Sequence, residues 1–148
     1  MAEIEYEREN SPCEDADKIV RQGLHNDNDK LLNDPVTHHS IFAKHEHRII
    51  GGALIYQHSD AVYIDSLWVE EGFRRQGIGR ELLLRVEQDA LEKGIRKQFI
   101  STTSQEAKAL YLRLGFECIA TVPEYLCGLD KYYLRKCTDT SSTVAVYK

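Results

Sequence analysis

A run of arginines and glycines at residues 74–79 is the part of this chain best suited to binding an anion. It reads Arg-Arg-Gln-Gly-Ile-Gly and lies between an expected strand, 61–69, and an expected helix that begins at Ile78. Glycine allows positive φ angles and a close approach of the backbone to a ligand. The first N–H groups of a helix have no intrahelical partner, so they can donate to phosphate oxygens. Positive charge beside them comes from Arg74, Arg75 and Arg80.

Composition limits the classes of protein to which the chain can belong. Its 148 residues, 42% of them hydrophobic, suffice for one domain with its own core. Lys and Arg number 19 against 24 Asp and Glu, and the resulting net charge of −5 argues against a nucleic-acid partner. No signal peptide and no apolar stretch long enough to span a membrane are recognisable. The four cysteines lack Cys-x-x-Cys spacing, so we expect reduced thiols in a cytoplasmic protein.

Hydrophobic periodicity predicts an α+β fold. Strands are expected at residues 4–8, 40–44, 48–57, 61–69, 98–102, 116–122 and 131–136, and helices at 15–25, 78–93 and 104–114. Short connections make the early strands antiparallel neighbours, whereas the second helix links two strands as a crossover. We therefore expect a mixed, mostly antiparallel sheet of about six to seven strands with helices on both faces. Residues 1–137 should form a single domain, and 138–148 a flexible tail.

Local signals mark the ends of the helices. Thr103 with Glu106 three residues later resembles a capping box, and Gly115 suits the end of the helix that follows. Residues 26–35 are polar and rich in turn formers, so the first helix is expected to stop before them. The inward stripe of the central helix consists of Ile78, Leu82, Val86 and Ala90.

Four of the six histidines lie close together, at His38, His39, His45 and His47. No set of cysteines or carboxylates completes a zinc pattern around them, and they cluster at an expected hairpin. We interpret them as turn and surface residues and expect no metal site.

Two segments resemble motifs of the GNAT superfamily of acetyltransferases. Its motif A, Arg/Gln-x-x-Gly-x-Gly/Ala, is matched by Arg74, Gly77 and Gly79 after a strand that ends Leu-x-Val. Residues 107–116, Ala-Lys-Ala-Leu-Tyr-Leu-Arg-Leu-Gly-Phe, resemble its motif B. The order of elements also resembles that of the superfamily from residue 4 to about 136. The nucleotide motifs with a Gly-Lys-Ser/Thr ending or a third glycine are absent.

The resemblance implies that the cofactor is acetyl-CoA. Its pyrophosphate would receive backbone N–H groups from Gln76, Gly77, Ile78, Gly79 and Arg80. Its pantetheine arm would pair, in the manner of a strand, with the backbone of Leu67, Trp68 and Val69. A parallel neighbour strand must then turn away to leave room, and one of these amides could also polarise the thioester carbonyl.

Tyr111 aligns with the tyrosine that members of the superfamily often use as general acid. A phenol can protonate the departing CoA thiolate, since its reference pKa is about 10. The alternative is a tyrosine that packs in the core beside Ala107 and Leu114. Both interpretations remain open at the level of sequence.

The attacking amine must lose a proton, and Asp65 is the candidate general base. A carboxylate in an apolar strand needs an explanation, and Tyr63 should share its face unless a bulge intervenes. Asp65 could instead bond to a neighbouring strand or bind the ammonium group of the substrate. Glu70 is a second candidate base.

Two hypotheses about function follow. The first is an N-acetyltransferase that moves acetyl from acetyl-CoA to a primary amine of a small molecule or peptide by direct attack in a ternary complex. The second is a non-catalytic acyl-CoA-binding or regulatory module that has kept the loop and lost the chemistry. The acceptor cannot be selected from the sequence, and a homodimer is possible in either case.

Overall fold

The computed structural model describes residues 2–138, and the part of the expected tail beyond Thr138 lies outside the described residues. The chain divides into two compact units, residues 1–35 and 36–148. The elements in chain order are α1 (Glu14–Leu32), β1 (Thr37–His45), β2 (Arg48–Gln57), β3 (Ala61–Val69), the short 3₁₀ helix η1 (Glu71–Phe73), α2 (Ile78–Glu92), β4 (Lys97–Thr102), α3 (Gln105–Arg113), β5 (Glu117–Leu126) and β6 (Leu129–Cys137). Within residues 2–138, no helix has both the length and the apolar composition needed to cross a membrane.

The first unit contains one helix, which is longer than predicted. Instead of stopping near residue 25, α1 continues through Gly23 to Leu32 and ends at Asn33, whose φ of 50° is left-handed. Polar pairs one turn apart support the extension: Gln22 Nε2 donates to Asn26 Oδ1 at 2.9 Å, and a further pair joins His25 and Asp29. These pairs stabilise the helical form of a segment whose composition suggested a turn.

The strand predicted at residues 4–8 is wrong. These residues are exposed and belong to neither a helix nor a strand. Alternation of Ile4 and Tyr6 with glutamates fits a strand locally, but a strand needs a neighbour with which to pair.

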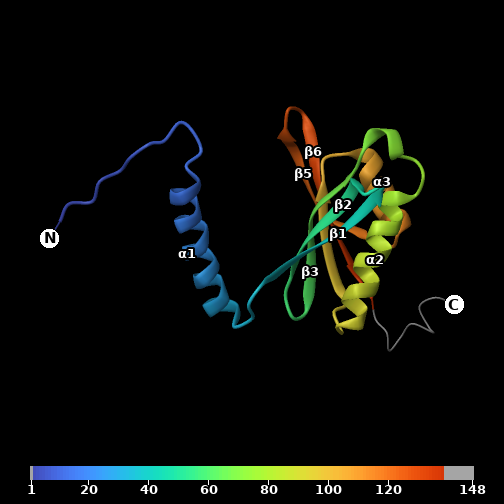
Figure 1. Ribbon diagram of the computed structural model, residues 1–148, viewed down its shortest axis with the longest axis horizontal. Coiled ribbons are helices and arrows are strands. Elements are labelled where there is room, and N and C mark those ends of the chain that lie inside the picture. Colours follow the sequence, from blue (N-terminus) through green and yellow to red (C-terminus); the bar gives the residue numbers. More distant parts are fainter. Residues whose placement is uncertain (1, 139–148) are drawn as a thin grey trace. The chain divides into compact units, whose positions relative to one another are not determined.

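The second unit contains a six-stranded sheet in the order β1-β2-β3-β4-β6-β5 (Figure 1). Its neighbours are antiparallel except β3 and β4, which are parallel and are joined through α2. The mixed, mostly antiparallel sheet confirms the predicted fold class. Strands β2 and β3 and the start of α2 have the bounds that the periodicity predicted.

One hydrophobic core joins α2 and α3 to the sheet. Ile64, Ile100 and Leu134 lie opposite one another on β3, β4 and β6, and each is at most 3% exposed. From α2 the core receives Leu83 and Val86 among others, and α3 adds a buried tyrosine. Figure 1 shows both helices lying along the same side of the sheet, so α2 and α3 do not cover both faces as predicted. Three residues of the predicted stripe, Leu82, Val86 and Ala90, are buried, whereas Ile78 is half-buried.

Several helix and strand ends differ from the predictions. The N-cap of α3 is Ser104, not Thr103, because the Ser104 hydroxyl accepts a hydrogen bond from the Ala107 N–H at 3.1 Å. Strands β5 and β6 are longer than expected and form a hairpin whose turn is Cys127-Gly128, with φ angles of 50° and 77°. The four cysteines are free thiols.

Polar contacts fasten the end of β6 to the rest of the unit. Lys136 and Glu87 form an ion pair of 3.0 Å with side chains 15% and 16% exposed, and Lys136 also donates to the Leu114 carbonyl at 2.7 Å. Thr138, which was assigned to the tail, is buried, and its N–H donates to the Arg96 carbonyl at 2.8 Å. Thr138 therefore packs with the second unit, although it lies one residue past the predicted boundary.

Leu134→Ala should lower the free energy of unfolding by about 2–4 kcal/mol, because it leaves a cavity where a side chain only 1% exposed had packed. Urea denaturation measures this change. Leu112→Ala is the matched control, since Leu112 is 44% exposed and should cost at most about 1 kcal/mol. Equal losses in the two variants would contradict the assignment of the core.

Candidate active site

Strands β3 and β4 pair over only part of their length. The parallel ladder runs from Ala61 opposite Lys97 to Ile64 opposite Ile100, although β3 continues to Val69. On the other side of β3 the register shifts at the same point: Ile64 faces Ile55, Ser66 faces Leu54, and the residue between them is extra. A β-bulge increases local twist and bends the strand. The bulge at Asp65 thus accompanies the separation of β3 from β4.

The free side of β3 presents backbone groups to the space that opens. The Glu70 N–H donates to the Ile50 carbonyl of β2 at 2.7 Å. Since alternate residues of a strand direct their backbone groups to the same side, Trp68 also faces β2, and Leu67 and Val69 face the opening. The Val69 carbonyl there accepts a hydrogen bond from Arg74 Nε at 2.8 Å. The other backbone groups of this edge suit an extended ligand.

The segment after β3 forms a concave row of backbone amides. Arg75 and Gly77 both have positive φ, 64° and 80°, and α2 starts immediately afterwards. The first helical hydrogen bond runs from the Glu81 N–H to the Gly77 carbonyl at 2.9 Å, so the preceding amides have no intrahelical partner. Such left-handed residues before a helix N-terminus make an anion-binding concavity. A Cβ added to Gly77 would meet no atom within 4 Å, which leaves the approach open.

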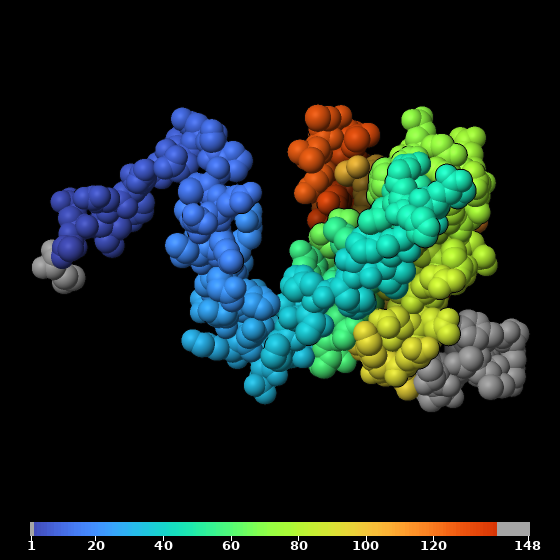
Figure 2. All heavy atoms as spheres, in the orientation of Figure 1, coloured from blue at the N-terminus to red at the C-terminus, as the bar shows by residue number. Residues whose placement is uncertain are grey.

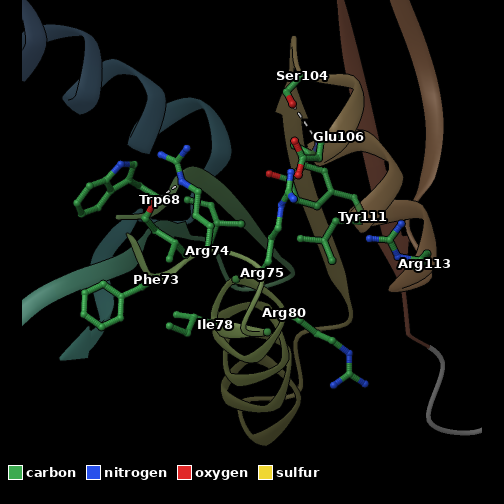
Figure 3. Close-up of a pocket in the computed structure, with 16 residues that line it drawn as sticks. Trp68, Phe73, Arg74, Arg75, Ile78, Arg80, Ser104, Glu106, Tyr111 and Arg113 are labelled. Carbon is green, nitrogen blue, oxygen red and sulfur yellow. Dashed lines mark hydrogen bonds between the residues drawn. The ribbon is translucent and has the colours of Figure 1, made fainter. Parts of the chain in front are cut away.

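A cavity of about 570 Å³ lies against this loop and α3. It is lined by Leu67, Trp68, Val69, Phe73, Arg74, Arg75, Gly77, Ile78, Gly79, Arg80, Ser104, Glu106, Ala107, Leu110, Tyr111 and Arg113. Figure 3 shows Arg75 extending from the loop towards the side of Tyr111 and Glu106, whereas Arg80 points away. Among the described residues, no ion pair occupies Arg75, Arg80 or Arg113.

Nine of the ten residues predicted to bind the cofactor line the cavity, and Gln76 does not. Tyr111 lines it as well, and Asp65 does not. Sequence reasoning missed Phe73 and most of the α3 wall, which is made of Ser104, Glu106, Ala107, Leu110 and Arg113. The helical spacing of Ser104, Ala107 and Tyr111 is a signal that could have found part of that wall.

Tyr111 is a buried phenol at the wall of the cavity. It is 5% exposed, and its ring lies 6.1 Å from that of Phe116, between ring centres. Burial raises the pKa of Tyr111 to about 12, because the phenolate would lose its hydration. At neutral pH the hydroxyl is therefore protonated and can act as a proton donor. The side chain packs in the core, as one of the two interpretations of Tyr111 held, and it also borders the cavity.

The structural argument for Asp65 differs from the one made from the sequence. Asp65 is exposed at the bulge, so its carboxylate is not a buried charge that needs a partner within the strand. Its Oδ2 accepts a hydrogen bond from Ser66 Oγ at 3.3 Å. The bulge also interrupts the alternation that would have put Asp65 on the face of Tyr63, whose hydroxyl lies 3.4 Å from Ser101 Oγ.

Glu70 is engaged elsewhere and is a poor candidate base. Both of its carboxylate oxygens accept hydrogen bonds from Arg48, one of them at 3.0 Å. These hydrogen bonds hold the pKa of Glu70 below its ordinary value. A carboxylate of lowered pKa that is already paired accepts a proton reluctantly.

The histidines have individual partners. His39 Nε2 lies 3.3 Å from Asp89 Oδ2, the ring of His38 stacks edge-on against Tyr56, and His45 lies against Phe73. In the part of the chain that the structure describes, no three potential ligands gather around a common point.

Known proteins are similar to this chain in sequence and in fold. Residues 2–116 match the family described as "Acetyltransferase (GNAT) family". Blasticidin-S acetyltransferase of Streptomyces morookaense is 30% identical over 89 residues, which are 60% of this chain and 65% of that protein, so the chain matches less than two thirds of its relative's length. A solved structure from Agrobacterium tumefaciens has a TM-score of 0.82 at 23% identity, and the match covers 91% of this chain and 100% of that chain. A GNAT family acetyltransferase from Elizabethkingia anophelis, solved with acetyl-CoA bound, has a TM-score of 0.60 at 21% identity, with 89% and 95% coverage.

Tyr111→Phe should change how stability depends on alkaline pH. The unfolded chain loses a phenol proton near pH 10, whereas folded Tyr111 holds it to about pH 12. The contribution of this group is therefore complete below pH 10 and is lost as pH rises towards 12.

Between pH 9 and pH 11, urea denaturation should show the wild-type protein losing about 1 kcal/mol more than the variant. Tyr6→Phe, at a position 93% exposed, serves as the control and should lose as much as the wild type. Parallel curves for wild type and Tyr111→Phe would contradict the raised pKa.

Proposed function

Because the chain belongs to the GNAT family of acetyltransferases, we propose that it transfers acetyl from acetyl-CoA to a primary amine of a small molecule or peptide. The amine attacks directly in a ternary complex. No acetylated cysteine takes part, since none of the four thiols lines the cavity. The free thiols also support a cytoplasmic location.

One observation carries most of this proposal. A single cavity is bordered by the anion-binding loop, by the unpaired edge of β3 and by the buried hydroxyl-bearing side chain of Tyr111. Binding alone would require only the loop and the strand edge. A buried proton donor beside them is what favours catalysis over a non-catalytic acyl-CoA-binding module.

Acetyl-CoA is the cosubstrate of this family, and when bound it supplies an activated acetyl thioester. In our proposal the amides from Gly77 to Arg80 hold its pyrophosphate, with Arg75 and Arg113 adding charge. The open backbone groups of Leu67 and Val69 hold the pantetheine arm, and an amide of this edge polarises the carbonyl. The Val69 carbonyl is already bonded to Arg74, so Val69 contributes its N–H.

Tyr111 delivers its proton to the leaving sulfur. Its high pKa keeps the hydroxyl protonated throughout the neutral range. The burial that raises the pKa of the phenol also raises the pKa of a thiol in the same cavity, which offsets the lower acidity of the phenol. Asp65 remains our candidate to receive the proton of the amine or to bind its ammonium group. Its exposed position at the bulge is open to an acceptor.

In our proposal, loops and the β5–β6 hairpin border the site that binds the acceptor. Figure 2 shows the surface hollowed between this hairpin, in orange, and the segment after β3, in green. Blasticidin S is the first compound to test, since the relative that acts on it is 30% identical over the matched region.

Tyr111→Phe should lower kcat at least about ten-fold and leave the Kd for coenzyme A nearly unchanged, since the phenol acts on the leaving group and not on the pyrophosphate. Thiol release with blasticidin S and a panel of amines measures the first quantity, and calorimetry the second. A Tyr111→Phe variant as active as the wild type would contradict the role of Tyr111 as general acid. Calorimetry that finds no binding of coenzyme A to the wild type would contradict the proposed function itself.

Gly77→Ala should weaken coenzyme A binding by about ten-fold, because a side chain at a φ of 80° strains the loop. Gly79→Ala is the matched control. Its φ is not left-handed, and the added methyl would lie at ordinary distances of 3.8 Å from Leu110 and 3.9 Å from Val69. Calorimetry should find its affinity within about two-fold of the wild type. Equal effects of the two substitutions would contradict the role of the Gly77 backbone.

A further inference from the structure

We propose that Arg48 and Glu70 are positioning residues that hold the acetyl-CoA loop in its binding conformation. The inference rests on the proposed function for the identity of the ligand. It concerns residues outside the wall of the cavity, since neither Arg48 nor Glu70 lines it.

The ion pair joins the first residue of β2 to the residue that follows β3. Arg48 Nη2 donates to Glu70 Oε2 at 3.0 Å, and Arg48 Nη1 donates to Glu70 Oε1. A planar guanidinium with two parallel hydrogen bonds fixes direction as well as distance. The Glu70 N–H is held at the same time by the Ile50 carbonyl at 2.7 Å. Both the backbone and the side chain of Glu70 are therefore anchored to β2.

Phe73 connects the Arg48–Glu70 pair to the wall of the cavity. The Arg48 guanidinium lies 5.9 Å from the centre of the Phe73 ring, and the ring of His45 lies 5.2 Å from it. The Phe73 N–H donates to the Glu70 carbonyl at 2.8 Å, and Phe73 itself lines the cavity. Figure 2 shows the tip of the β1–β2 hairpin, in cyan, against the green segment that contains these residues.

The loop needs such an anchor because packing does not supply one. The 3₁₀ helix η1 has no buried residue, and residues 74–77 are exposed. Arg75 nevertheless has a φ of 64°, which costs a residue with a side chain about 1 kcal/mol. A strained, exposed segment keeps its conformation only if contacts at its ends define it. Arg74, bonded to the Val69 carbonyl, and the Arg48–Glu70 pair are those contacts.

The test breaks this pair and compares it with a similar pair at the opposite end of β3. Arg48→Gln should weaken coenzyme A binding roughly three- to five-fold, the upper range for an exposed ion pair, and should speed hydrogen exchange of the amides from 74 to 80 in the free protein. The control is Lys97→Gln, which removes the 2.8 Å pair between Lys97 and Asp60. It should change neither calorimetric affinity nor exchange in the loop.

A charge exchange makes the result specific to the pair. Glu70→Arg alone should weaken binding more than Arg48→Gln does, and the double variant Arg48→Glu with Glu70→Arg should recover most of the loss. Wild-type affinity and wild-type loop exchange in Arg48→Gln would overturn the inference and leave the proposed function intact. If the wild type does not bind coenzyme A, the proposed function fails, and loop exchange in Arg48→Gln still decides whether the pair orders the loop.

Discussion

The loss of pairing between β3 and β4 beyond Ile64 and Ile100 is the constraint on which the rest of this molecule depends. Parallel neighbours that separate leave backbone N–H and C=O groups without a partner, and such groups are costly unless something else bonds to them. The bulge at Asp65 gives β3 the extra twist to diverge, while its pairing with β2 continues to Val69. One side of β3 stays paired with β2, and the other is open. In our proposal this open edge holds the pantetheine arm of acetyl-CoA.

The core that stabilises the sheet also determines the chemistry of the phenol. Tyr111 belongs to the same cluster of buried side chains as Leu134 and Val86, and its burial is what raises its pKa. The packing of Tyr111 and its raised pKa have one cause, since the low-dielectric surroundings that accept the ring penalise its ionised form. Tyr111 lies on α3, which follows β4 in the chain and forms one wall of the cavity. The loop and the start of α2 form another part of the wall.

Different kinds of contact hold the two ends of the loop. Behind it, α2 is fixed by a buried apolar stripe that includes Leu82 and Val86. In front, the segment from Glu70 to Arg75 is exposed and depends on polar contacts with β2 and with the end of β3. An arrangement of this kind allows the amides to be aligned before a ligand arrives, so that little ordering is needed on binding. The stability of the fold and the conformation of the loop therefore depend on different contacts.

Local patterns in the sequence determined the limits of β2 and β3, the start and stripe of α2, and the anion-binding loop, because periodicity, turns and glycine spacing act over a few residues. These patterns predicted a strand at residues 4–8, because the lack of a partner strand is not visible in composition. They also ended α1 too early, because composition does not show the polar pairs one turn apart. The bulge at Asp65 depends on the register between two strands, and the engagement of Glu70 depends on an arginine 22 residues away. Tyr111 could be aligned by its motif, but its proton affinity could not be read from it. These properties were decided by the tertiary structure alone, because register, burial and charge pairing are relations between segments that only folding brings into contact.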